Sequence, residues 1–221
     1  WDYNDENIVM LEVFMFPTGS FGRMENELYW REKNKGTDIP ITVGILIADV
    51  RRQLEREYIF NYINRLNLET GNLIDFYIPG YIKVSNQDDY DNMKYYLNNC
   101  TERFKLGKNF YYFSYELFYE FLDKLGEHSN KHLTPDPKII LVSYADEQIC
   151  FGDSIVFDLR KEDRENSISE LFQFIINIAR KTTEFEEFKR KIFLDNSKNK
   201  FIKFVKNKLP DQLLSFVISK F

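Results

Sequence analysis

The chain has 221 residues, of which 43% are hydrophobic and 29% are charged. These values are typical of a folded globular protein and exclude general disorder. No apolar run approaches the roughly 18–20 residues that a membrane helix needs, so we expect no spanning segment. Residues 1–6 are acidic where a secretory signal would be basic and then apolar, and cysteine is scarce, so we expect a reducing, bacterial-type cytoplasm.

The formal net charge of −5 is distributed unevenly along the chain. Between residues 180 and 208, ten basic residues outnumber four acidic ones, so this segment carries +6 and the remainder of the chain −11. A basic segment on an acidic body can bind nucleic acid, an anionic surface or an acidic partner. A solvated helix face is the simpler interpretation of the same pattern.

The first part of the chain alternates apolar runs with polar connections. Residues 8–16 form an apolar run rich in strand formers, and the turn chemistry of residues 17–22 ends it. Residues 23–40 predict a long connection or a short helix around residues 24–32. Residues 41–48 are nearly all apolar and β-branched, which predicts a strand buried on both faces of a parallel sheet.

A helix is expected to follow this strand, with Asp49 as its N-cap and Gly71 at its end. Residues 73–78 predict the next strand, closed by the turn pair Pro79-Gly80. A second helix, amphipathic and reaching Cys100, is expected after this turn.

The next expected elements are a short aromatic strand at residues 110–113 and a third helix. Ser114 predicts the N-cap of this helix and Gly126 its end. Residues 138–143 and 149–159 then predict two strands joined by a short link, which favours an antiparallel pair.

Capping boxes of the form S/T-x-x-E predict the last helices. One box begins at Ser167 and predicts the start of the fourth helix, whose apolar face continues to Ala179. A second box begins at Thr183, where we expect the helix to restart and run to Leu194. Further helical pieces are expected within residues 201–221.

From residue 41 to residue 179 the expected order is strand, helix, strand, helix, strand, helix, strand, strand, helix. This order predicts an α/β fold with a mostly parallel sheet, helices on both faces and a terminal antiparallel hairpin. We expect residues 1–40 to form an N-terminal strand and connection. Residues 41–180 would form the α/β core domain, and residues 181–221 a basic C-terminal helical extension.

Two stretches within residues 41–180 carry a resemblance to a known family. Residues 73–77 run apolar-apolar-Asp-Phe-aromatic and resemble the central strand of the thioredoxin-like fold, and Pro137 stands where that family places a cis-proline. The family's two cysteines separated by two residues are absent, since the corresponding stretch is residues 78–83. The resemblance therefore implies a thioredoxin-like fold without redox chemistry. A Rossmannoid sheet, flavodoxin-like or TIR-like, is the alternative.

The sequence motifs of nucleotide-binding and zinc-binding sites are incomplete or absent in this sequence. Residues 19–23 read Gly-Ser-Phe-Gly-Arg and lack the lysine end of a P-loop, and no G-x-G-x-x-G follows a strand. His128 and His132 have the spacing of helix-borne metal ligands, but no Glu follows the first of them. We therefore expect no catalytic residue, no cofactor and no metal site.

In the absence of a motif, candidate ligand-binding residues can be chosen by their position. Ligands of parallel α/β sheets lie beyond the carboxyl ends of the strands. At these strand ends an arginine side chain can bind a phosphate group, and a tyrosine ring can stack on a nucleotide base. The candidate ligand-binding residues are Asp49, Arg51, Arg52, Tyr81, Ser114 and Tyr115. Asp75, inside a predicted strand, needs a partner if it is buried, and we expect that role to be structural.

The predicted function is a non-catalytic protein-interaction or sensor module, a subunit or domain of a bacterial assembly such as an antiviral (anti-phage) defence system. The alternative is a nucleotide-binding or nucleotide-hydrolysing effector on a Rossmannoid sheet. We expect a protein partner or self-association, and no membrane. The expected interaction residues are Lys198, Lys200, Lys203, Lys206, Phe216 and Phe221. Nucleic acid is a weaker candidate for these lysines, because a chain that carries −11 elsewhere repels a polyanion.

Overall fold

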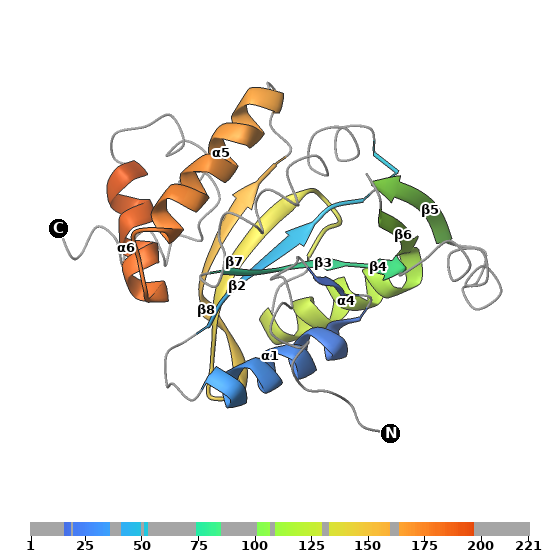
Figure 1. Cartoon of the computed structure of the whole chain (residues 1–221), viewed down its shortest axis with the longest axis horizontal. Coiled ribbons are helices and arrows are strands. Elements are labelled where there is room, and N and C mark those ends of the chain that lie inside the picture. Colours follow the sequence, from blue (N-terminus) through green and yellow to red (C-terminus); the bar gives the residue numbers. More distant parts are fainter. Residues whose placement is uncertain are drawn as a thin grey trace, which may run out of the picture.

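The protein is built around a central five-stranded sheet, with a smaller three-stranded sheet extending from one end (Figure 1). The computed structural model describes residues 16–18, 20–35, 41–49, 51–52, 74–84, 101–106, 109–129, 133–159 and 164–196. Several predicted segments lie outside these residues: the N-terminal run 8–15, the helices after Asp49 and before Cys100, and the stretch from 197 to 221.

The five-stranded sheet has the strand order β1-β3-β2-β7-β8. Its strands are β1 (Phe16–Thr18), β2 (Ile41–Ile47), β3 (Ile74–Pro79), β7 (Lys138–Ala145) and β8 (Gln148–Asp158). β1, β3 and β2 are parallel to one another, whereas β7 and β8 are antiparallel to their neighbours. The sheet is therefore mixed, which confirms the predicted α/β class and the predicted antiparallel hairpin.

β2 is the middle strand and is buried on both faces, as its continuous apolar sequence predicts. Gly44 of β2 stands opposite Phe76 of β3, and the Phe76 ring lies across the glycine. A Cβ atom at position 44 would lie 2.4 Å from that ring. Glycine is thus required here because the aromatic side chain occupies its space.

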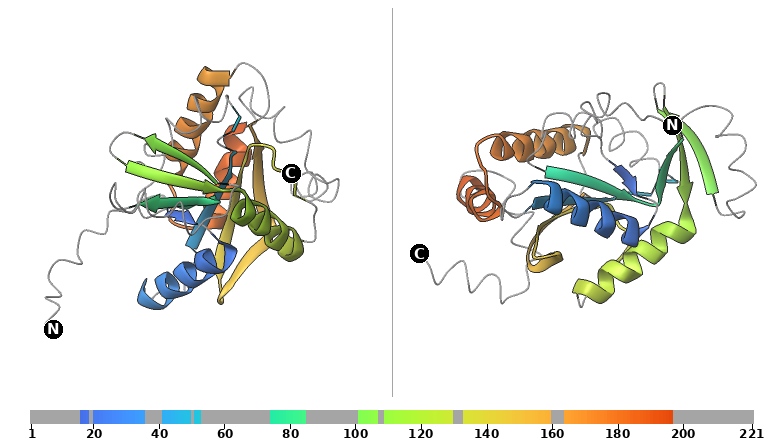
Figure 2. Two further views of the ribbon diagram at one scale, coloured as in Figure 1. Left: turned by 90° about the vertical axis from the view of Figure 1, so that its right-hand side faces the viewer. Right: turned by 60° about the horizontal axis from the view of Figure 1, so that its bottom comes forward.

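Helices cover both faces of the sheet, as predicted (Figure 2). Helices α1 (Phe21–Lys35) and α4 (Tyr115–Ser129) pack on one face and touch each other, with the Phe21 and Phe121 rings edge to face at 5.3 Å. Helices α5 (Arg164–Ala179) and α6 (Phe185–Asn196) lie on the other side and contact each other.

Three helix boundaries differ from the sequence-based expectation. α1 is longer than the short helix expected within residues 24–32, because the Ser20 hydroxyl accepts the N–H of Arg23 and caps an earlier start. α4 continues through Gly126 to Ser129, because packing against α1 outweighs the low helix propensity of one glycine. α5 begins at Arg164, so Ser167 lies inside the helix and is not its cap.

The short aromatic strand exists, but it belongs to a different sheet from the one expected. It is β6 (Asn109–Ser114), which lies between β4 (Tyr81–Val84) and β5 (Thr101–Leu106) in an antiparallel sheet. The chain enters this sheet at Gly80, whose φ of +79° is open to glycine at little cost. The expected parallel alternation therefore stops after β3.

The β7–β8 hairpin has a tight turn that α1 stabilises. The two turn residues, Asp146 and Glu147, have φ angles of 53° and 61°, as a type I′ turn requires. Their backbone N–H groups donate to the carboxylate of Glu32 in α1, at 3.0 and 3.1 Å. The adjacent Lys33 forms an ion pair with Glu147 at 2.6 Å.

The residues before β2 are part of the same core. β1 pairs with β3, and Phe21, Met24 and Leu28 of α1 are buried in the hydrophobic core. Pro17, expected in a turn, lies in β1 at the sheet edge, where a missing N–H is tolerated. No peptide bond of the described residues is cis, including the bond before Pro137.

Candidate functional site

The predicted ligand-binding residues gather where β2 and β6 end and β4 and α4 begin. Asp49 follows β2, Tyr81 opens β4, Ser114 ends β6 and Tyr115 opens α4. We call these four residues, together with Arg51 and Tyr119, the strand-end cluster. The following contacts connect them.

Asp49 and Arg51 form the centre of the strand-end cluster. Asp49 is 2% exposed, and its carboxylate accepts two hydrogen bonds from the Arg51 Nε at 2.9 and 3.0 Å and another from Nη2. The same carboxylate accepts the backbone N–H of Arg51 at 3.0 Å, as an N-cap residue does. The bond to Asp49 raises the pKa of Arg51 further above its usual value, so the guanidinium is always charged.

Two tyrosines of α4 complete the surroundings of Arg51. The guanidinium carbon lies 4.0 Å from the centre of the Tyr115 ring, a cation–π contact. Nη2 also donates to the Tyr119 hydroxyl at 3.4 Å. Sequence reasoning missed Tyr119, although its position four residues after Tyr115 places both rings on one side of the helix.

Tyr81 and Ser114 hold the backbone of the strand-end cluster. The Tyr81 hydroxyl donates to the carbonyl of Ala48 at 3.0 Å, which links β4 to the end of β2. The N–H of Ser114 donates to the Gly80 carbonyl at 2.8 Å, and its hydroxyl accepts the N–H of Leu117 at 3.4 Å. Ser114 is therefore the predicted helix cap, and both residues are buried.

Arg52 has a different partner from Arg51. Its Nη1 lies 3.6 Å from the carboxylate of Asp136, in the segment before β7. The structure thus joins Asp49, Arg51 and Tyr115 by direct contacts. Tyr81 and Ser114 lie next to them and bond to the backbone of Ala48 and Gly80, whereas Arg52 links the end of β2 to another segment.

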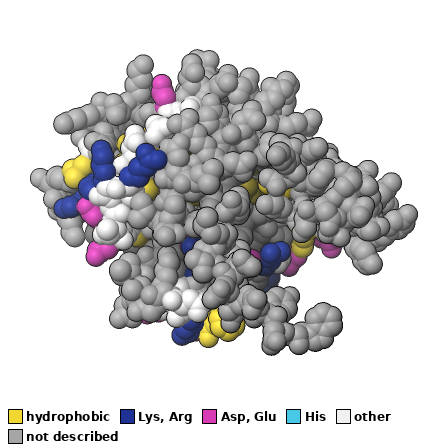
Figure 3. Space-filling model, viewed as in Figure 1, with side chains coloured by type: hydrophobic (Ala, Val, Ile, Leu, Met, Phe, Trp, Pro, Cys, Tyr) yellow, Lys and Arg dark blue, Asp and Glu magenta, His cyan; other side chains and the backbone are white. Residues whose placement is uncertain are grey.

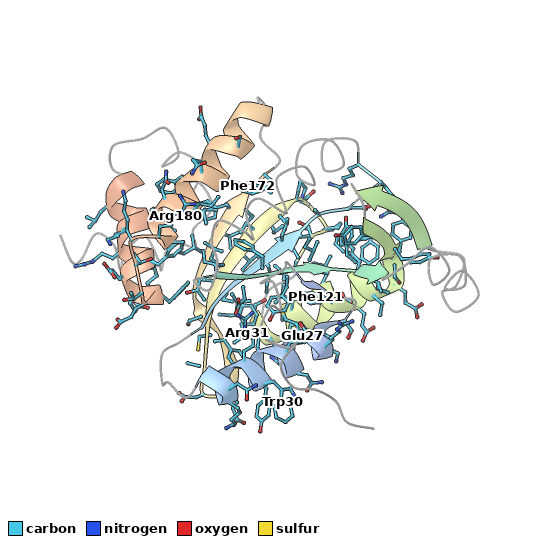
Figure 4. The ribbon with its side chains drawn as sticks, in the orientation of Figure 1. Glu27, Trp30, Arg31, Phe121, Phe172 and Arg180 are labelled. Atoms are coloured by element: carbon cyan, nitrogen blue, oxygen red, sulfur yellow. The ribbon has the colours of Figure 1, made fainter. Side chains whose placement is uncertain are left out.

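A second polar cluster lies between α1 and β3 and was only half predicted. Asp75 has the expected partner, because the Arg31 Nη1 lies 2.7 Å from its carboxylate, whose exposure is 1%. Figure 4 shows Arg31 and Glu27 between α1 and the sheet. Tyr77 belongs to the same cluster, and its pKa is raised by burial and by the negative charge of Asp75, while Arg31 acts in the opposite direction. The sequence showed that Asp75 needed a partner, but not which residue supplies it.

The described part of the chain includes one histidine, His128, and one cysteine, Cys150. No group of three His, Cys, Asp or Glu side chains there could hold a metal ion. His128 stacks on Phe21 at 5.0 Å, and His132 lies outside the described residues. Cys150 is a free, half-buried thiol, whereas Cys100 is not among the described residues.

The basic segment divides into two parts with different properties. Residues 180–196 contain five of its ten basic residues and all four acidic ones, and Lys189 and Lys191 are paired with Glu186 and Glu187. This half is therefore close to neutral. The other five lysines lie beyond residue 196, outside the described residues, as do the expected interaction residues Lys198, Lys200, Lys203, Lys206, Phe216 and Phe221.

None of the helices between residues 16 and 196 that the structure describes combines the length and apolar character needed to cross a bilayer. In comparisons with known proteins, no family model, no curated protein and no solved structure matches this chain.

Proposed function

We propose that this chain is a non-catalytic protein-interaction or sensor module, acting as a subunit or domain of a larger bacterial assembly. The pairing inside the strand-end cluster carries the proposal. Asp49 and Arg51 bind each other, and Arg51 also rests on Tyr115. Acid–base or nucleophilic catalysis requires a side chain directed at a substrate atom, whereas these groups hold the ends of β2, β4 and α4 together.

A thioredoxin-like topology without redox chemistry is part of this proposal. It is supported by the strand order β1-β3-β2-β7-β8, by the hairpin of β7 and β8, and by the helix that follows it. In that family the two cysteines begin the helix after the central strand. The strand that resembles the family's central strand is β3, and residues 78–83, at its end and beyond, contain no cysteine. β2, the middle strand of this sheet, is followed by Asp49-Val50-Arg51-Arg52, which contain no cysteine either. We therefore expect no thiol–disulfide exchange activity.

Exposed apolar side chains supply further support. Trp30 is 62% exposed, and Tyr119, Val156 and Leu194 are each more than 40% exposed. Tryptophan and tyrosine are enriched among the residues that dominate the energetics of protein interfaces. An exposed tryptophan on a helix is therefore better suited to a partner than to solvent.

The oligomeric state and the partners of this chain test the proposal directly. Light scattering at micromolar concentration should find a species larger than the 26.6 kDa monomer, or mass spectrometry should find a stoichiometric protein partner after purification from the native cells. A strict monomer with no co-purifying protein would refute the proposal.

The lysines beyond residue 196 have a test of their own. Replacing Lys198, Lys200, Lys203 and Lys206 by Glu should slow association with an acidic protein surface, and added salt should act mainly on the association rate. Nucleic-acid binding would instead show a salt slope of about 0.9 per phosphate contacted. Unchanged assembly in this variant would show that the lysines form only a solvated face.

A nucleotide-binding function is the second candidate, and one observation favours it. The strand-end cluster brings an arginine and two tyrosines together, and the Arg51 side chain is 43% exposed. A thermal-shift screen with nucleotides, cyclic dinucleotides and NAD would detect such binding as a rise in Tm. A flat panel would exclude this candidate.

A further inference from the structure

The turn of the β7–β8 hairpin contains two residues with a backbone conformation that most side chains avoid. Asp146 and Glu147 have φ angles of 53° and 61°, and no other residue of the described ranges except glycine has a positive φ. This left-handed region is open to Gly and tolerated by Asn and Asp, but it is uncommon for Glu. Turns of this type therefore favour Asn-Gly, and Asp-Glu forms one only at a cost in backbone strain.

The end of α1 holds this turn in its strained shape. Glu32 accepts the Asp146 N–H with Oε1 at 3.0 Å and the Glu147 N–H with Oε2 at 3.1 Å, so each carboxylate oxygen has its own donor. Hydrogen bonds to an ionised acceptor are stronger than those between neutral groups. Figure 1 shows the tip of the hairpin beside this end of α1. The strain of the turn is thus balanced by a residue 114 positions earlier in the chain.

The residues on either side of Glu32 fasten the same end of α1. Arg31 forms an ion pair with the buried carboxylate of Asp75 at 2.7 Å, and Lys33 forms one with Glu147 at 2.6 Å. Three consecutive residues of α1 thus contact β3 and the hairpin turn. Charged side chains fasten this end of the helix, whereas the first half of α1 contributes apolar side chains to the core.

The outer side of α1 faces solvent near this end. Trp30, the residue before Arg31, is 62% exposed, and Figure 4 shows it projecting outward from the helix. Figure 3 shows hydrophobic and basic side chains together over the same outer side. A helix end with solvent on one side and a few polar contacts on the other can open locally, without unfolding of the sheet.

We propose that residues 31–33 and the Asp146–Glu147 turn form a latch, in which the docked end of α1 holds the turn in its strained conformation. Opening the latch breaks the contacts of α1 and lets the turn relax, so the contacts favour the closed state and the strain favours the open one. The end of α1 and the tip of the hairpin therefore open and close together. The latch is a property of the isolated chain and does not depend on the proposed interaction function.

Glu32→Gln is the first test, because it keeps the shape of the side chain but replaces one of the two acceptor oxygens by a donor. Amide hydrogen exchange, resolved by residue with NMR, reports local opening. Exchange should become about tenfold faster or more both at residues 31–34 of α1 and at the closing pair of the hairpin, Ala145 and Gln148. Glu127→Gln, which changes an exposed glutamate of α4, is the matched control and should alter neither segment.

Relief of the strain is the second test. The double variant Asp146→Asn/Glu147→Gly introduces the residues that this turn favours, so the closed latch no longer stores strain. Exchange at residues 31–34 should become about threefold slower or more, although α1 itself is unchanged. Asp146→Asn/Glu147→Ala is the matched control. It also removes the partner of Lys33 but keeps a Cβ atom at the φ of 61°, so it should not slow exchange.

Three results would overturn the inference. If Glu32→Gln fails to speed exchange at both segments, the helix end and the hairpin tip do not open together. If Asp146→Asn/Glu147→Gly leaves exchange at residues 31–34 unchanged, the turn stores no strain that acts on α1. If residues 31–34 of the unaltered chain exchange as slowly as Ile45 in the middle strand, the helix end opens only when the whole protein unfolds.

Discussion

Two aspartate–arginine pairs in this protein have buried carboxylates but differ in the distance between the partners along the chain. Asp49 and Arg51 are two residues apart at the end of β2, whereas Arg31 and Asp75 come from α1 and β3. The carboxylate side chains are 3% and 1% exposed, and the arginines 43% and 23%. We call them the local pair and the distant pair.

The comparison shows that the same two residue types can serve different purposes. The local pair can form whenever the chain turns after β2, and the exposed side of Arg51 keeps contact with water. The distant pair forms only when α1 docks on the sheet, so it reports and stabilises tertiary structure. Removing a cation should therefore cost more at the distant pair, where less water can solvate the remaining carboxylate.

Arg31→Met should have the largest effect. It leaves the carboxylate of Asp75 buried between α1 and β3 without its cationic partner, at a cost of about 3–5 kcal/mol in the free energy of unfolding. Urea denaturation followed by circular dichroism measures this loss. The double variant Arg31→Met/Asp75→Leu should recover much of it, and a double variant as unstable as the single one would show that the charge pair is not the cause.

Alkaline pH should weaken the protein on the α1 side of the sheet. Burial raises the pKa of Tyr144 from 10.0 to about 12, and burial together with Asp75 raises the pKa of Tyr77. The folded state holds these protons more tightly than the unfolded chain, so their contribution is complete below pH 10 and is lost as the pH rises towards 12. Denaturation at a series of pH values should show this fall. It should be shallower in Tyr77→Phe, and an equal fall would contradict the role of Tyr77.

Arg51→Ala should have a smaller effect than Arg31→Met. Asp49 loses its guanidinium partner but keeps the backbone N–H of Arg51, and it lies at the end of a strand. We expect a loss of about 1–3 kcal/mol, measured by the same denaturation. A loss as large as that of Arg31→Met would mean that the local pair is as inaccessible to water as the distant pair.

Lys33→Ala should have the smallest effect and serves as the reference for both pairs. Lys33 and Glu147 are 2.6 Å apart, but their side chains are 50% and 53% exposed. An exposed ion pair contributes little to stability, because water solvates both charges in the folded and the unfolded chain. A larger loss of stability would indicate that this contact supports the β7–β8 turn beyond its charge.

The sequence predicted those parts of the fold that depend on interactions between residues close together in the chain. The apolar residues of β2, the hairpin of β7 and β8, and the helix cap Ser114 all follow from neighbouring residues, and the structure contains them. The membership of the strand-end cluster was predictable, although the reasoning placed β6 in the same sheet as β2. β6 lies in the other sheet and reaches the cluster where the Ser114 N–H donates to the carbonyl of Gly80, the residue after β3. The internal pairing of the cluster was not predictable, since periodicity places residues on a face without showing which atoms touch.

The sequence by itself determined the α/β class, the buried middle strand and the need of Asp75 for a partner. Only the tertiary structure decided that this partner is Arg31, that β6 joins a separate sheet, and that α4 passes through Gly126. It also decided that α1, which carries the exposed Trp30, packs beside α4, which carries Tyr119. The physical reason is that hydrogen bonds between near neighbours and hydrophobic periodicity are local, whereas ion pairing, sheet membership and surface exposure depend on segments far apart in the chain.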